Sequence, residues 1–261
     1  MSYIQEYLEK GREIISIVAA QEEKIKEVAQ VFAATILKGR MVHVFGSGHS
    51  RIMVEEMWPR YGSFPGFNPI VELSLSFHNL VIGANGQRQA MFIENVSGLA
   101  NRILRNFDLS EEDSALVISS SGCNVVPIEM AEEFQKKNIK VAGLVSKLHL
   151  EGSTSKHKDG KKLDDFSDYV LDTGAPLGDA MIKIEGLDSP VSPGSTLGGV
   201  LIINTLKAEI ASILMQNGKE PKVLSSGKLI GEQRAKDLFE SAYDEHAHLM
   251  AKLYQNVGKN G

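Results

Sequence analysis

Apolar side chains recur every three or four residues between positions 3 and 38, and lysine and glutamate side chains fill the opposite face. This period is typical of amphipathic helices. It predicts one long helix, or two helices in succession, ending at Lys38-Gly39. Further along the chain, the apolar residues form short runs that are typical of strands buried on both faces. These runs cover residues 41–45, 70–75, 114–119, 140–145 and 169–172.

Helical patterns lie between and after these runs, at residues 97–107, 126–138 and 196–217. Pro127 stands in the first turn of the second helix, a position that suits proline. The alternation of strands and helices predicts an α/β fold with a doubly wound parallel sheet. Two long loops, 147–165 and 173–195, follow predicted strands and should lie at the carboxyl ends of the sheet. Open α/β sheets bind their ligands there.

Composition narrows the class of protein. The chain has 261 residues, enough for an ample core, and a formal net charge of −5. That charge argues against a nucleic-acid partner, which needs a concentrated basic face. The single cysteine, Cys123, excludes an internal disulfide and favours a reducing compartment. The N-terminus lacks a signal-peptide core, and no apolar run reaches the roughly 18 residues of a membrane span. We therefore expect one cytoplasmic domain, 1–261, with no membrane partner.

The first polar turn that could carry chemistry is GSGHS at 46–50, directly after a predicted strand. A dinucleotide-binding loop needs a third glycine where Arg51 stands, and the Gly-Lys-Ser/Thr ending of a P-loop is missing. What remains is a tight turn that could bring backbone N–H groups and the hydroxyls of Ser47 and Ser50 close to a ligand. A plain strand-to-helix turn without a ligand fits this pattern equally well.

The second polar turn, VISSSGCN at 117–124, also follows a strand and precedes a helix. Its three serines place hydroxyl donors beside the free backbone N–H groups of a helix N-terminus. The helix dipole favours an anion there by roughly 0.3–1 kcal/mol. Capping of the helix by serine is the structural alternative, but a cap uses one hydroxyl and this turn has three. We interpret the turn as a phosphate site.

Together the two turns, with the GLVS that ends the next strand, resemble the SIS (sugar isomerase) domain, whose members bind phosphosugars. The resemblance covers roughly residues 35–215, which leaves an N-terminal helix at 1–34 and a C-terminal helical extension at 218–261. It implies a flavodoxin-like five-stranded parallel sheet, a homodimer or homotetramer, and a phosphosugar ligand near a subunit boundary. By position, Ser119, Ser120, Ser121 and Asn124 would hold the phosphate, while Gly48 and Ser50 would approach the sugar.

Within that family the phosphoheptose isomerases are the most similar. The Glu-Glu pair and following Arg-Tyr of their first helix resemble Glu55-Glu56 followed by Arg60-Tyr61. The second glutamate of their pair is the catalytic base, which implies that role for Glu56. This chain is shorter before the pair by about one helical turn, which keeps the helix face but moves the carboxylate by about 5 Å. Adjacent helical residues point about 100° apart, so one of the two would face the site. A surface position of both is the alternative.

The isomerases also place a catalytic histidine in the last core helix, where this chain has Asn204 and Thr205. The histidines that could take over that role are His49, His78, His149 and His157. We favour His49 as the catalytic acid, because an imidazole in the first turn would stand beside the sugar and exchange protons near neutral pH. A packing role for His49 is the alternative. His246 and His248 are two residues apart and do not share a helix face for a metal.

Three functions stay open. In an aldose–ketose isomerase, Glu56 would shuttle a proton between adjacent sugar carbons and His49 would help to open the ring, with no metal or organic cofactor required. In an etherase of the muramic acid 6-phosphate type, Glu56 and Glu94 would act as a pair without a histidine. The third function is a non-catalytic phosphosugar-binding regulator. We interpret Cys123 as a small core residue rather than a nucleophile.

Overall fold

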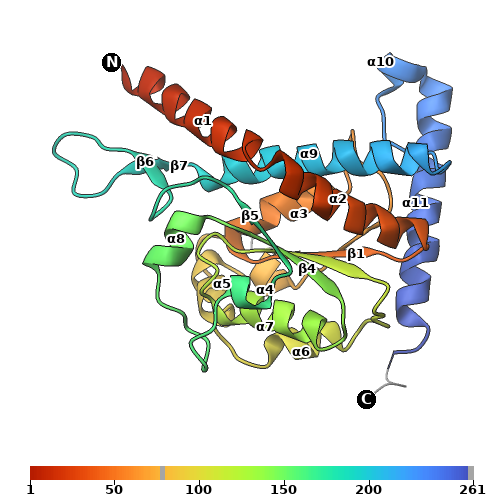
Figure 1. Cartoon of the computed structure of the whole chain (residues 1–261), viewed down its shortest axis with the longest axis horizontal. Helices are drawn as coiled ribbons and strands as arrows, with labels where there is room; N and C mark the ends of the chain where they lie inside the picture. Colours follow the sequence, from red (N-terminus) through yellow and green to blue (C-terminus); the bar gives the residue numbers. More distant parts are fainter. Residues whose placement is uncertain (77–79, 258–261) are drawn as a thin grey trace.

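The computed structural model describes residues 1–76 and 80–257. Its centre is a five-stranded parallel sheet in the order β2-β1-β3-β4-β5 (Figure 1). The strands are β1 (Val42–Gly46), β2 (Phe67–Pro69), β3 (Ser114–Ile118), β4 (Lys140–Val145) and β5 (Tyr169–Asp172). This is the flavodoxin-like strand order, so the predicted α/β doubly wound fold is confirmed. Every residue of β1 and β3 is buried, which is why these strands appear in the sequence as uninterrupted apolar runs.

Helices cover both faces of the sheet (Figure 1). One face carries α1 (Tyr3–Ala19), α2 (Glu22–Leu37), α3 (Arg51–Met57) and α9 (Ser195–Gln216), and the other carries α6 (Leu99–Leu104) and α7 (Val125–Gln135). Alternate strand residues serve the two faces. Val42 and Val44 belong to the core under the first set of helices, and Phe45 belongs to the core under the second.

The helical pattern at 3–38 corresponds to two helices that meet at Ala20-Gln21. The Gln21 amide is paired with the backbone of Asp172, since its Nε2 donates to the carbonyl and its Oε1 accepts from the N–H, both at 2.8 Å. These bonds attach the helix junction to the end of β5. Beyond the junction α1 extends past the sheet, where the Tyr7 hydroxyl donates to the Pro193 carbonyl at 3.0 Å (Figure 1).

The strand predicted at 70–75 is wrong. The edge strand β2 is shorter and lies earlier, and the chain turns after it into the short helix α4 (Leu73–Ser76). Ile70 still donates its N–H to the Val44 carbonyl at 2.9 Å. Ile70 and Leu75 are apolar because both pack in the core under α6 and α7. A proline such as Pro69 is tolerated in an edge strand, where its missing N–H would have faced outward.

The two long loops contain short elements. The first holds α8 (Lys147–Gly152) and the 3-10 helix η2 (Leu163–Phe166), and the second holds the antiparallel pair β6 (Ala180–Ile182) and β7 (Val191–Pro193). Another 3-10 helix, η1 (Gly48–Ser50), follows β1, and α5 (Gln87–Ile93) follows α4. The C-terminal extension forms α10 (Gly227–Ile230) and α11 (Glu232–Tyr254). α11 packs on Met41 and Phe107 at the amino ends of the strands.

α9 is the one helix among the described residues that is long and apolar enough to cross a membrane, with a mean hydropathy of 1.5. It packs against α1, α2 and α3 in the structure, which accounts for its apolar composition. Its close approach to the sheet depends on Gly198, because a Cβ there would lie 1.8 Å from the Thr173 carbonyl oxygen.

A buried polar cluster lies at the amino ends of the strands. Arg40 donates to both carboxylate oxygens of Asp113 at 2.8 Å, and His43 Nε2 lies 3.3 Å from Asp113 Oδ2. Asn68 donates to His43 Nδ1 at 2.9 Å. Burial by itself would raise the pKa of Asp113, but the hydrogen bonds with His43 and Arg40 bring it below its usual value. The cluster joins β1, β2 and β3 at the end of the sheet remote from the polar turns.

Candidate functional site

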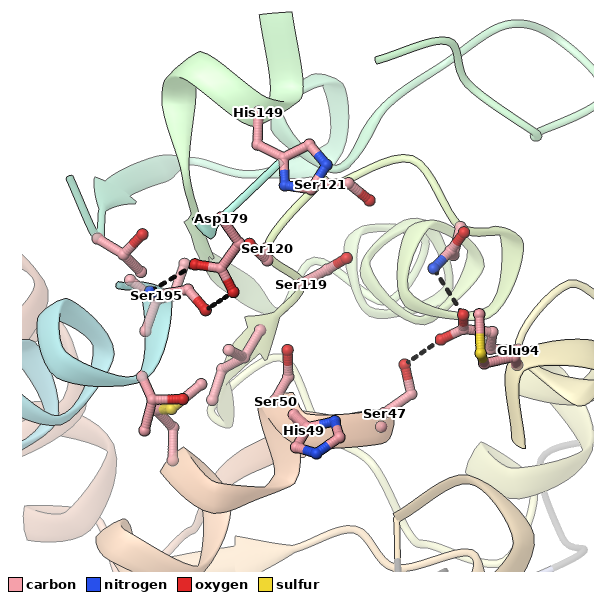
Figure 2. Close-up of a pocket in the computed structure, with 18 of the residues that line it drawn as sticks. Ser47, His49, Ser50, Glu94, Ser119, Ser120, Ser121, His149, Asp179 and Ser195 are labelled. Carbon is pink, nitrogen blue, oxygen red and sulfur yellow. Dashed lines mark hydrogen bonds between the residues drawn. The ribbon is translucent and has the colours of Figure 1, made fainter. Parts of the chain in front are cut away.

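A pocket of about 280 Å³ lies at the carboxyl ends of the strands (Figure 2). It brings together most of the predicted site residues, namely Gly48, His49, Ser50, Ser119, Ser120, Ser121 and Asn124. The two polar turns, about seventy residues apart in sequence, thus form opposite walls of one cavity. This position follows from the parallel sheet, which directs the ends of β1 and β3 to the same edge.

The first turn continues from β1 directly into η1 and α3. Gly46 is required there, because a Cβ would lie 2.7 Å from the Ser50 carbonyl oxygen. Gly48 has a φ of +56°, which glycine adopts without steric cost. Ser47 is buried and directs its hydroxyl toward Glu94, whereas the His49 side chain is exposed at the mouth of the pocket (Figure 2).

The second turn leads from β3 into α7, with Asn124 as the residue before the first helical position. Gly122 has a φ of +61°, and a Cβ on it would lie 2.6 Å from Leu150. The Ser120 hydroxyl is buried and has no hydrogen-bond partner among the described residues. The Ser119 and Ser121 hydroxyls accept from N–H groups within the turn, at 3.2 and 3.3 Å. The turn therefore offers hydroxyls and a helix N-terminus to the cavity.

Glu94, at the C-terminus of α5, directs its carboxylate into the pocket between the two turns (Figure 2). Ser47 donates to Oε2 at 3.0 Å and Asn124 donates to Oε1 at 2.9 Å. Burial raises the pKa of Glu94 above its usual value, although the hydrogen bond from Ser47 and the charge of Lys156 act against that rise. A desolvated carboxylate with a raised pKa is a stronger base than an exposed one and a candidate for proton transfer.

Asp179 is the second pocket carboxylate, and it caps the N-terminus of α9. Its Oδ1 accepts from the N–H groups of Gly194 and Ser195 at 3.1 and 2.7 Å, and its Oδ2 accepts from the Ser195 hydroxyl at 2.8 Å. The α9 N-terminus therefore already holds an anion. The start of η1 and α3, with Ser50, and the start of α7, with the three serines of the second turn, also face this pocket.

Glu55 and Glu56 are not among the described residues that line this pocket. The Glu56 carboxylate accepts from Arg60 and, at 2.8 Å, from Asn204 of α9. The Lys207 ammonium donates to the Glu56 carbonyl at 2.8 Å, and burial lowers the pKa of Lys207. Asn204 is thus a hydrogen-bond partner of Glu56 outside the pocket. Glu55 is exposed and its carboxylate lies 3.9 Å from Arg51, whereas the Glu56 side chain is mostly buried against α9.

The histidines are widely separated. His149 lines the pocket from α8, and its Nδ1 is buried without a hydrogen-bond partner among the described residues. His157 is buried behind the second turn, 3.9 Å from the Glu132 carboxylate. His246 packs on Trp58, and burial lowers its pKa. His78 lies outside the described residues. No group of three or more His, Cys, Asp or Glu side chains within residues 1–76 and 80–257 is placed to hold a metal ion.

The thiol of Cys123 is buried, with its Sγ 3.8 Å from the Ser153 carbonyl oxygen. Burial raises the pKa of Cys123, so the thiol is a poor nucleophile. Sequence reasoning gave Asp179 no role. No local signal marks it, because Asp179 is 16 positions away in sequence from Ser195 of α9 and the β6–β7 pair lies between them.

Comparisons with known proteins agree with this architecture. The SIS domain family matches residues 6–146. UPF0309 protein BH0227 of Halalkalibacterium halodurans is 31% identical, over 95% of this chain and 97% of that protein. UPF0309 protein Teth39_1980 of Thermoanaerobacter pseudethanolicus is 32% identical, over 89% of this chain and 92% of that protein.

Solved structures share the fold. The phosphoheptose isomerase of Francisella tularensis superposes with a TM-score of 0.50 and 19% identity, over 80% of this chain and 98% of its own. The phosphoheptose isomerase of Neisseria gonorrhoeae gives the same TM-score, with 15% identity over 80% of this chain and 97% of its own. With the family match over residues 6–146 and relatives aligned over nearly the whole chain, this protein is a member of the SIS domain family.

Proposed function

We propose that this chain binds a sugar phosphate in the pocket and interconverts its aldose and ketose forms. The observation that carries the proposal is that the pocket places a phosphate-compatible turn beside a desolvated carboxylate. One wall offers serine hydroxyls and the N-terminus of α7, which suit a phosphate, and a desolvated carboxylate, Glu94, lies between that wall and the first turn. In the bound sugar phosphate, Ser119, Ser120 and Ser121 hold the phosphate, and the sugar lies toward Gly48 and Ser50.

Glu94 takes the role of base in this proposal in place of Glu56. The ionised carboxylate removes a proton from the hydroxyl-bearing carbon beside the carbonyl, and the carbonyl oxygen takes up a proton, which gives an enediol. The carboxylic acid then returns its proton to the former carbonyl carbon, while the neighbouring hydroxyl releases its proton and becomes the new carbonyl, which balances the proton taken up before. No atom is gained or lost overall. An imidazole, His49 or His149, donates a proton to the ring oxygen as the sugar opens. Phosphate binding far from the reacting carbons supplies the orientation.

The etherase is the second candidate, because two carboxylates line the pocket. In that reaction one carboxylate takes a proton from the carbon next to the ether carbon, and the other protonates the lactate oxygen as it leaves. Asp179 would have to be that proton donor. Both of its carboxylate oxygens already accept hydrogen bonds from Gly194 and Ser195 at the α9 N-terminus, so neither is free to take part in proton transfer to the leaving oxygen. This contrast favours the isomerase.

Product analysis after incubation with sedoheptulose 7-phosphate and with muramic acid 6-phosphate separates the two reactions. We expect isomerisation of a sugar phosphate that E94Q abolishes while Glu56→Gln retains most of it. Release of lactate from muramic acid 6-phosphate would establish the etherase instead. Thermal stabilisation by both compounds without turnover of either would establish the non-catalytic regulator.

We also propose that the chain assembles as a homodimer or homotetramer, and the cytoplasmic location stays a prediction. Apolar side chains are exposed near α5, the helix that leads to Glu94, with Val81 at 79%, Ile82 at 69% and Phe92 at 74% exposure. Large exposed apolar patches mark protein interfaces, and these side chains are candidates for such a contact. Light scattering at micromolar concentration tests this proposal, and a monomer at every concentration would contradict it.

A further inference from the structure

The segment that follows α8 returns to the pocket and places a lysine on the second turn. The Lys156 backbone N–H donates to the Cys123 carbonyl at 2.9 Å, and its ammonium donates to Asn124 Oδ1 at 2.9 Å. The lining of the pocket contains no lysine or arginine among the described residues. Lys156 is therefore the cation at the rim of the wall where we place the phosphate.

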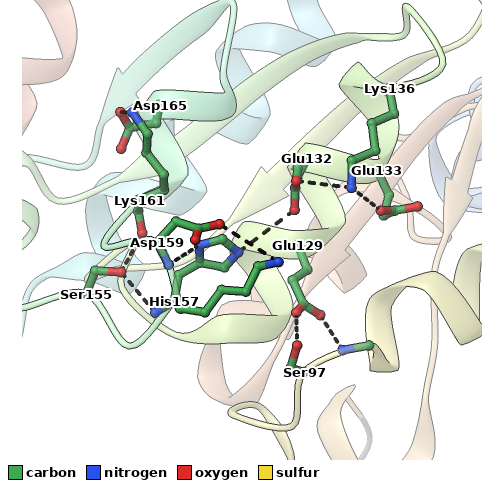
Figure 3. Close-up of polar contacts among 12 residues, drawn as sticks. Ser97, Glu129, Glu132, Glu133, Lys136, Ser155, His157, Asp159, Lys161 and Asp165 are labelled. Atoms are coloured by element: carbon green, nitrogen blue, oxygen red, sulfur yellow. Dashed lines mark hydrogen bonds and ion pairs between the residues drawn. The ribbon is translucent and has the colours of Figure 1, made fainter.

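The two neighbours of Lys156 in the chain, Ser155 and His157, are held by hydrogen bonds (Figure 3). The preceding residue, Ser155, accepts from the His157 N–H at 3.0 Å and donates to the Lys161 carbonyl. The following residue, His157, is buried, and its Nδ1 accepts from the Asp159 N–H at 3.4 Å. Its Nε2 lies 3.9 Å from the Glu132 carboxylate on α7. These contacts fix the backbone of the loop, while the Lys156 side chain stays exposed to solvent.

Asn124 connects this lysine to the pocket carboxylate. Its Oδ1 accepts from the ammonium, and its Nδ2 donates to Glu94 Oε1 at 2.9 Å (Figure 2). The two charged groups thus impose one orientation on the amide. Ser47 is the other donor to Glu94, and the remaining titratable groups around the pocket are His49, His149 and Asp179, from three other segments. Unlike these groups, Lys156 carries an ammonium, whose charge can act on Glu94 through Asn124.

We propose that Lys156 is a positioning residue that couples phosphate binding to the basicity of Glu94. In the free protein its ammonium holds Asn124, and its charge favours the ionised carboxylate of Glu94. When a phosphate binds at the second turn, the ammonium turns from Asn124 to the phosphate oxygens. Glu94 then loses the support of that charge and becomes a stronger base at the moment when the substrate is in place. The inference rests on the proposed function, since it requires the phosphate at this turn.

Two measurements on Lys156→Met test it, with inorganic phosphate as the probe. Calorimetry gives the phosphate affinity, and carbon-13 NMR of labelled glutamate carboxyls, with E94Q to assign the signal, gives the titration of Glu94. We expect about a tenfold loss of phosphate affinity, which corresponds to about 1.4 kcal/mol, because a charge-assisted hydrogen bond to the phosphate is lost. We also expect the Glu94 signal of the phosphate-free protein to titrate at higher pH than in the wild type.

Two variants serve as controls. Lys156→Arg keeps the charge and should retain most of both properties. Lys158→Met removes an equally charged lysine two residues away, whose side chain is 75% exposed and pairs only loosely with Asp159 at 3.9 Å. It should change neither property, which separates the specific contact from a general loss of positive charge.

Equal phosphate affinity in the wild type and K156M would overturn the inference. So would a loss of affinity with an unchanged titration of Glu94, because Lys156 would then be a phosphate ligand and nothing more. A wild-type protein that binds no inorganic phosphate would remove the proposed function and this inference with it. That outcome differs from failure of the inference alone, in which the wild type binds phosphate and K156M binds it as well.

Discussion

Replacement of Asp179 by glycine removes the carboxylate that caps α9. Glycine is the appropriate substitution because residue 179 has a φ of +70°, which an alanine would adopt only with strain. The lost cap, with its N–H partners at 2.7 and 3.1 Å, costs about 1 kcal/mol, and the lost charge at the N-terminus of a 22-residue helix costs about 1 kcal/mol more. A loss of about 2 kcal/mol lowers the Tm by about 4–8 °C in a protein of this size.

Circular dichroism at 222 nm during heating measures this change. Asp179→Asn keeps a carbonyl acceptor and tolerates the same φ, so its Tm should fall by about half as much as that of D179G. Asp188→Asn, an exposed position between β6 and β7, is the matched control and should melt like the wild type. Inorganic phosphate should bind D179G at least as tightly as the wild type, because a negative charge has left the pocket. A Tm within about 1 °C of wild type, or a collapse of phosphate affinity, would refute the capping role and the placement of the phosphate away from α9.

Three further changes test other parts of the structure. E94Q should lower turnover of the sugar phosphate by about 10²–10⁴-fold. Because the pKa of Glu94 is raised in the folded state, the stabilisation that this carboxyl gives is present at acid pH and is lost as the pH rises. The Tm of E94Q should therefore exceed that of the wild type at pH 7, and the difference should vanish toward about pH 4. Gly198→Ala should fail to give a cooperative melting transition in far-UV circular dichroism, since the new Cβ meets the Thr173 carbonyl at 1.8 Å. Asp113→Asn should lower the free energy of unfolding in urea at pH 7 by about 3–5 kcal/mol, because the charge of Arg40 is left without its carboxylate partner. The pKa of Asp113 is lowered in the folded state, so the stabilisation that Asp113 gives disappears as the pH falls. The difference in unfolding free energy between the variant and the wild type should therefore close in acid.

The fold could be predicted from the sequence because its main signals are local. The runs that became β1, β3 and β4 are buried at nearly every residue, and burial of that kind leaves its mark along a whole strand. β5 is the exception, since only Leu171 of its four residues is fully buried. β2 was misplaced because an edge strand of three residues leaves little pattern, whereas the apolar residues after it, Ile70 and Leu75, serve the core from a loop and a short helix.

The place of the second polar turn at the pocket could also be predicted from the sequence, since its residues are consecutive in the turn after β3. Of the carboxylates, Glu94 was a candidate from the sequence only as the partner of Glu56, and Asp179 was missed, because their positions depend on tertiary contacts. Glu56 resembles the isomerase base by its neighbours, yet its carboxylate binds Asn204, a residue 148 positions away in sequence. Glu94 reaches the pocket from the end of α5, a helix without a clear periodic pattern, and Asp179 reaches it from a loop. Only the folded chain brings these side chains together.

The most direct test of the phosphate site is a crystal structure of the protein soaked with a mixture of sugar phosphates. We expect phosphate density within hydrogen-bond distance of the Ser119, Ser120 and Ser121 hydroxyls at the start of α7, with the sugar carbons facing Glu94. Phosphate density at the N-terminus of α9, or sugar density beside Glu56 outside the pocket, would contradict the proposed site.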